Sequence, residues 1–111
     1  MAISNTRLTN TASTPVYTSS GTNAITTIIA CNTGTPDLTD ETVDQVSLTL
    51  FFVPNGSSAG DSTTVVSNLI IPAGETVFFS DEKVILSDSD SIVAQADAGN
   101  LLTITVSVLP V

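Results

Sequence analysis

The fold class follows from the stretch Gln45-Val46-Ser47-Leu48-Thr49-Leu50-Phe51-Phe52-Val53. Every even-numbered position in it is apolar, whereas Ser47 and Thr49 stand between them. This period of two predicts a β-strand whose even-numbered side chains lie in the core. Phe51 and Val53 break the polar pattern on the opposite face, so we expect that end of the strand to be covered by a loop or by a partner. Pro54-Asn55-Gly56 then closes the strand as a turn.

On both sides of this stretch, short runs rich in β-branched residues alternate with turn residues, and no segment has a helical period. The further predicted strands cover residues 16–18, 24–32, 63–71, 76–80, 83–86, 92–96 and 101–109. Residues 33–44 are polar and acidic, which favours a long surface loop. Seven or eight short strands in one chain of 111 residues predict an all-β fold, an antiparallel β-sandwich. A small barrel is the main alternative.

The sandwich must be stable without a disulfide, because Cys31 is the one cysteine. The chain also lacks Trp, so an Ig-like description applies to the architecture alone. We expect Cys31 to be a small buried residue. Residues 1–13 are predicted to form an N-terminal arm or edge strand, and residues 14–111 a single β-sandwich domain.

The charge balance excludes several classes of function. The formal net charge is −9, the cations are Arg7 and Lys83, and there is no histidine. Binding of nucleic acid or of an anionic membrane rests on several Lys or Arg contacts, so we expect neither. The N-terminus has no cationic region followed by a long apolar run, and we expect a protein made in the cytoplasm and not exported by the usual route.

Catalysis would have to use carboxylates alone, as in glycoside hydrolysis. Two pairs are available, Asp81 with Glu82 and Asp88 with Asp90. The chain has four Phe, one Tyr and no Trp to stack on a sugar, so we predict no enzyme and no cofactor. Asp88-Ser89-Asp90 lacks the further ligands of a calcium loop, which favours a solvated turn over a metal site. The same interpretation covers the acidic residues of the long loop, Asp37, Asp40 and Glu41.

The remaining functional hypothesis is contact with other proteins. In each of the pairs Phe51-Phe52 and Phe78-Phe79, one ring of a regular strand must point away from the core. Such a ring is a candidate for a protein contact, although burial under a loop is the alternative. The predicted contact residues are Arg7, Leu8, Tyr17, Phe51, Val53 and Phe79.

Several motifs carry a resemblance to a known class of proteins. They are Thr6-Arg7-Leu8-Thr9-Asn10-Thr11, residues 16–26, Leu50-Phe51-Phe52-Val53-Pro54-Asn55-Gly56, Leu69-Ile70-Ile71-Pro72-Ala73-Gly74-Glu75-Thr76 and Asp90-Ser91-Ile92-Val93-Ala94-Gln95-Ala96. Together the chain resembles small virion structural proteins of tailed bacteriophages, particularly phages of marine bacteria and cyanobacteria.

The resemblance implies a non-enzymatic part of a virion, assembled in the host cytoplasm. Size and single domain resemble capsid decoration or cement proteins, which often act as homo-oligomers. The implied partners are other virion proteins: the major capsid protein, or tail and neck proteins. The alternative is a neck, baseplate or tail-fibre module that attaches other virion proteins or binds a host-surface glycan. The long acidic loop departs from that pattern.

Overall fold

The computed structural model describes residues 2–80 and 84–111. Nine strands and one short 3-10 helix form in this part of the chain. The strands are β1 (Ala2–Arg7), β2 (Thr14–Thr18), β3 (Asn23–Asn32), β4 (Val46–Val53), β5 (Thr64–Ile71), β6 (Thr76–Phe79), β7 (Val84–Leu86), β8 (Ser91–Ala96) and β9 (Leu102–Pro110). The helix η1 spans Asp61–Thr63. The predicted strand over residues 83–86 thus begins with a residue, Lys83, that lies outside the described part.

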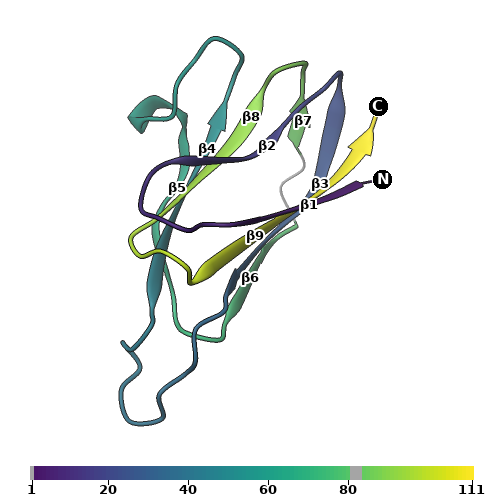
Figure 1. The fold of residues 1–111 in the computed structure, drawn as a ribbon. Coiled ribbons are helices and arrows are strands. Elements are labelled where there is room, and N and C mark those ends of the chain that lie inside the picture. The colour runs from purple at the N-terminus through teal and green to yellow at the C-terminus, as the bar shows by residue number, and fades with distance from the viewer. Residues whose placement is uncertain (1, 81–83) are drawn as a thin grey trace.

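The strands form two antiparallel sheets (Figure 1). The first sheet has the order β1-β9-β3-β6, and β7 also pairs with β3. The second sheet has the order β2-β8-β4-β5. The prediction of an all-β antiparallel sandwich is therefore confirmed. β1 is an edge strand of the first sheet, and its antiparallel pairing with β9 brings the two ends of the chain together.

The connectivity is that of a jelly roll. The strand pairs are nested: β4 pairs with β5, β3 with β6, β2 with β8 and β1 with β9, as in one long hairpin that has been rolled up. β6 and β7 together take the place of one strand beside β3. Phe79 of β6 lies opposite Ile28, and Val84 of β7 lies opposite Ile25. An Ig-like description covers the two-sheet architecture and leaves this strand order open.

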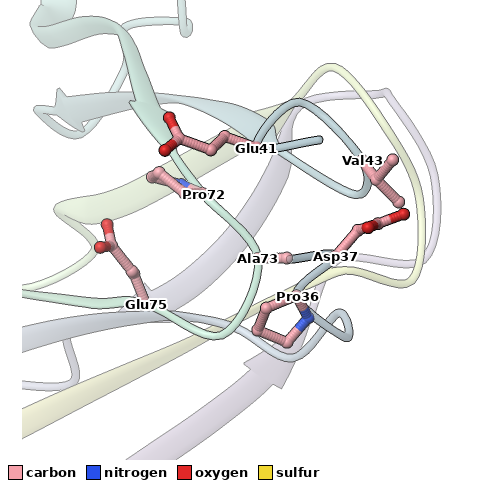
Figure 2. A pocket seen from close by; sticks show the side chains of 7 residues that line it. All are labelled: Pro36, Asp37, Glu41, Val43, Pro72, Ala73 and Glu75. Carbon is pink, nitrogen blue, oxygen red and sulfur yellow. The ribbon is translucent and has the colours of Figure 1, made fainter. Parts of the chain in front are cut away.

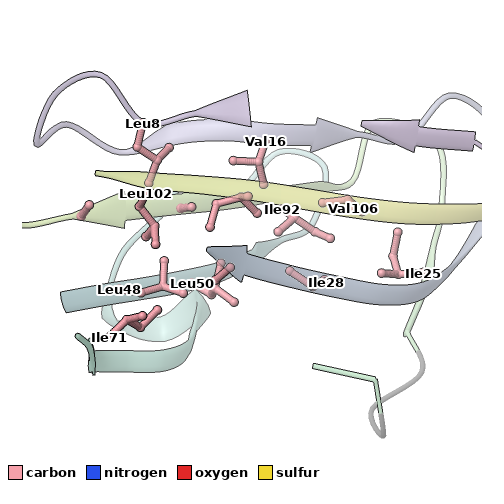
Figure 3. Packing of buried hydrophobic residues seen from close by; sticks show 14 of the residues in the cluster. Leu8, Val16, Ile25, Ile28, Leu48, Leu50, Ile71, Ile92, Leu102 and Val106 are labelled. Carbon is pink, nitrogen blue, oxygen red and sulfur yellow. The ribbon is translucent and has the colours of Figure 1, made fainter. Parts of the chain in front are cut away.

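The core lies between the sheets and follows the alternation of the strands (Figure 3). In β4 the side chains of Val46, Leu48 and Leu50 are buried, and Phe52 packs against them. β9 contributes Leu102, Ile104, Val106 and Val108 in the same way. Burial of such aliphatic side chains stabilises a domain by about 1.5–3 kcal/mol each, so these positions hold the two sheets together.

Asn32 is a fully buried polar residue at the end of β3. Its amide nitrogen donates to the carbonyl oxygens of Asp44 (2.7 Å) and Ile71 (2.9 Å), and its side-chain oxygen accepts from the N–H of Gly34 (2.9 Å). These bonds hold both ends of the long loop, residues 33–45, against the end of β3, and the bond to Ile71 links β3 of the first sheet to β5 of the second. The loop itself is exposed, as predicted, apart from the half-buried Gly34.

Candidate contact surface

The outer surface of the first sheet carries four large exposed apolar side chains. Ile3 of β1 is 69% exposed, Phe78 of β6 62%, Ile85 of β7 65% and Leu109 of β9 42%. In β6 and β7 the strand neighbours face the interior: Val77 and Phe79 pack against the core on either side of Phe78, and Val84 and Leu86 do so on either side of Ile85. We call these four side chains the apolar face.

The register of the strands places these side chains in cross-strand rows. Leu109 and Ile85 both lie opposite Ala24 of β3, on either side of it. Phe78 lies opposite Ile29, which is half-buried on the same surface. Ile3 of β1 lies between these two rows, opposite Ser107, which pairs with Thr27. Neighbours within a row are in contact, whereas the row of Phe78 and the row of Ile85 and Leu109 lie five residues apart along β3. Solvent-exposed apolar areas of this kind typically mark interaction sites.

The apolar face is also free of negative charge. None of the nine strands formed by residues 2–80 and 84–111 contains an Asp or Glu, although the chain as a whole carries eleven. Arg7 is the charged residue of β1; its guanidinium donates to the carbonyl oxygen of Asn100 at the edge of the sheet. A partner could therefore cover the described strands of this sheet without removing their own carboxylates from water, which would be costly.

The six predicted contact residues differ in how far they are exposed to solvent. Of the six, Arg7 is exposed, and Tyr17 and Phe79 are half-buried against the core. Leu8 is a fully buried core residue, because its backbone N–H pairs with the carbonyl oxygen of Leu102 and draws it under the first sheet. Phe78, and not Phe79, is the ring of its pair that points outward. Alternation predicts one outward ring in the pair, but the choice between the two depends on the pairing of β6 with β3.

Phe51 and Val53 point away from the main core, as predicted, but a loop covers them. Phe51 is 6% exposed and Val53 7%, and both pack with Val93 of β8 and with Ala59. Ala59 belongs to the loop between β4 and β5. We call this group the covered cluster. In this structure it is not accessible to a partner, so the loop alternative is the correct one for this end of β4.

A pocket of about 290 Å³ lies between the long loop and the turn before β6 (Figure 2). The carboxylates of Asp37, Glu41 and Glu75 surround it. Asp37 accepts hydrogen bonds from the N–H and the hydroxyl of Thr39 (2.9 and 2.8 Å), and these bonds, the backbone one first, lower the pKa of its carboxyl. No group of three or more His, Cys, Asp or Glu side chains in the described residues could hold a metal ion. The Asp37 carboxylate therefore works as a turn cap.

The pair Asp88 and Asp90 is likewise engaged with backbone groups. Asp90 accepts from the N–H groups of Ser87 (2.9 Å) and Asn55 (2.8 Å), and Asp88 accepts from that of Gly21 (2.8 Å). These bonds fit the interpretation of a capped, solvated turn. The other carboxylate pair, Asp81 and Glu82, lies outside the described residues.

Cys31 was expected in the interior, but it is half-buried on the outer surface of the first sheet. Its strand neighbours Ala30 and Asn32 are buried, so alternation turns Cys31 outward. It lies opposite Thr76 of β6 and Thr103 of β9.

In the described part of the chain, no helix has the length and apolarity needed to cross a bilayer. Comparison of the chain with known protein families, with curated proteins and with solved structures yields no match.

Proposed function

We propose that this protein is a non-enzymatic phage virion structural protein, a capsid decoration protein that docks on other virion proteins and on its own copies through the apolar face. The observation that carries the proposal is that the described strands of one sheet expose four large apolar side chains and contain no Asp or Glu. Such a surface loses little on leaving water and gains from burial, at about 25 cal/mol per Å² of apolar area.

The distribution of charge supports the same orientation. The described acidic residues lie outside the strands, and four of them, Asp37, Asp40, Glu41 and Asp44, belong to the long loop at one end of the sandwich. A protein bound by its apolar face would keep these carboxylates in water. The resulting negative surface would favour solubility and disfavour indiscriminate association of particles.

The first experiment locates the protein in a particle. Phage particles from a host culture that produces this chain are purified by density-gradient centrifugation. The chain is then quantified in them by mass spectrometry and located by electron microscopy. Several copies per capsomer are expected for decoration. A few copies at one vertex would favour the alternative, a neck, baseplate or tail-fibre module. Absence from particles would refute both.

The second experiment tests the surface. The double variant Ile85→Ser, Leu109→Ser removes two exposed side chains of the apolar face that flank Ala24. A matched control, Val65→Ser with Ile70→Ser, alters two similarly exposed residues of β5 on the other sheet (51% and 57%). We expect the first variant to lose self-association in sedimentation velocity and retention on particles, and the control to keep both. Equal behaviour of the two variants would contradict the assignment of the surface.

A further inference from the structure

The outer surface of the second sheet carries a feature that contact through the apolar face does not use. Two adjoining hollows there share Thr49 of β4, Asn68 of β5 and Gln95 of β8. One hollow, of about 140 Å³, extends to Asp97, and the other, of about 570 Å³, extends to Asp61. We call the two together the polar groove. The larger hollow is shallow and open, and it is lined mostly by polar side chains.

A β-bulge forms the polar groove. Leu48 pairs with Leu69, but Leu50 pairs with Val66, so two residues of β5 stand opposite the single residue Thr49. The second of the two, Asn68, has a left-handed backbone (φ 51°), and its N–H donates to the Thr49 hydroxyl (3.2 Å). Bulges of this kind redirect a side chain and are frequent next to functional sites. Here the bulge places the Asn68 amide beside the groove.

The polar groove offers hydrogen-bonding groups of both kinds. Asn68 and Gln95 each carry an amide with two donor hydrogens and an acceptor oxygen, and the Thr49 hydroxyl can donate and accept. Gln95 is held in place by a bond from its amide nitrogen to the carbonyl oxygen of Thr11 (3.1 Å). Phe51 lines the larger hollow but is 6% exposed, so the groove binds through its polar groups. Amides and hydroxyls are groups that exchange hydrogen bonds with the hydroxyls of a polyol.

The charges at the polar groove restrict its ligand further. Carboxylates lie at both ends, Asp61 and Asp97, and the described residues that line it include no Lys or Arg. A phosphate, sulfate or carboxylate group would be repelled there. An uncharged ligand rich in hydroxyl groups would instead find donors and acceptors along the whole length. We propose that the polar groove binds a neutral oligosaccharide.

This proposal is independent of the proposed function, because the polar groove and the apolar face belong to different sheets. The test is a titration of the ¹⁵N-labelled full chain, followed by NMR, with soluble neutral oligosaccharides built from glucose, mannose and galactose. A sulfated oligosaccharide of the same length serves as the charged probe. At least one neutral probe should shift the side-chain amide signals of Asn68 and Gln95, whereas the sulfated probe should leave them in place.

The variant Asn68→Gly removes the amide but suits the left-handed backbone, so we expect the fold to persist and the affinity to fall at least about tenfold, a difference of about 1.4 kcal/mol. Asn100→Gly is the matched control, since Asn100 also has a positive φ (63°) but lies outside the groove. The proposal is overturned if no neutral probe, at a concentration of about 10 mM, shifts the side-chain amide signals of Asn68 and Gln95. That result would mean a binding free energy weaker than about 3 kcal/mol. Equal affinity of the two variants, or stronger binding of the sulfated probe, overturns it as well.

Discussion

The apolar face and the covered cluster present similar side chains on the outer surfaces of the two sheets, with opposite results. Phe51 of β4 points away from the main core and is 6% exposed, because the loop that carries Ala59 lies over it. Phe78 of β6 also points away from the core, yet it is 62% exposed. An outward aromatic ring is therefore not by itself a sign of a binding surface. What distinguishes the two positions is whether the chain supplies its own cover.

The largest expected difference is between the alanine variants of these two rings. We expect Phe51→Ala to lower the free energy of unfolding by about 3 kcal/mol, because it leaves a cavity beneath the loop. Phe78→Ala should change the free energy of unfolding of the isolated chain by no more than about 0.5 kcal/mol, as for other exposed positions. Urea unfolding measures both. An equal decrease in the free energy of unfolding of the two variants would contradict the view that Phe51 is covered and Phe78 is not.

Asn32→Ala should follow in size. The substitution leaves the carbonyl oxygens of Asp44 and Ile71 and the N–H of Gly34 without their side-chain partner. We expect the free energy of unfolding to fall by about 2 kcal/mol. Because Asn32 holds the long loop and touches neither the apolar face nor the covered cluster, particle retention should not change. Hydrogen exchange should be faster at residues 33–45, and an unaltered exchange rate there would refute the anchoring role.

Asp90→Ala tests the loop that covers Phe51 with a smaller expected loss of stability. The Asp90 carboxylate accepts from the N–H of Asn55, in the turn that starts the covering loop. Its loss should cost about 1 kcal/mol of unfolding free energy. It should also increase the binding of a hydrophobic dye, since the covered cluster opens more often. Asp88→Ala is the control, because Asp88 bonds to Gly21 in a different loop. Dye binding that rises equally in both variants would argue against a cover held by Asp90.

The smallest effect concerns the long loop, which covers no apolar residue cluster. The Thr42 hydroxyl, followed by its N–H, lowers the pKa of Asp40, whereas for Asp37 the N–H of Thr39 acts first and its hydroxyl second. Thr42→Val should therefore remove the larger cause and raise the pKa of Asp40 toward its ordinary value, whereas Thr39→Val should leave the larger cause, the N–H of Thr39, in place and raise the pKa of Asp37 only in part. Carboxyl ¹³C titration measures both shifts.

The sign of the pH effect follows from these depressed pKa values. A carboxyl with a lowered pKa in the folded state stabilises the fold above its unfolded pKa, and this contribution disappears as the pH falls through the folded pKa. Since Asp37 and Asp40 are fully exposed, acid should loosen the loop with little effect on the two sheets. Loss of β-sheet circular dichroism over the same acidic range would contradict this separation.

The candidate site was less predictable than the fold. Alternation placed Phe51 and Val53 on the outer surface of β4 but could not place the loop above them. For Phe78 and Phe79, alternation predicts that one ring points outward but does not predict which one. The pattern around Ile85 and Leu109 does not predict an exposed site, because each stands in a short apolar run. The two residues become neighbours only when β7 and β9 pair with β3 on either side of Ala24. The polar groove has no sequence signal beyond the turn-prone pair Ser67-Asn68.

By itself, the sequence determined the strands, the faces that meet in the core and the acidic surface loop, because side-chain direction along a strand and the solvation of charge are local properties. Tertiary structure alone decided the nested strand order, the cover over Phe51 and the rows that bring Leu109 and Ile85 together. These depend on which strands pair and on the path of a loop through space. Each is set by the sum of many distant contacts, and no single stretch of the chain encodes them.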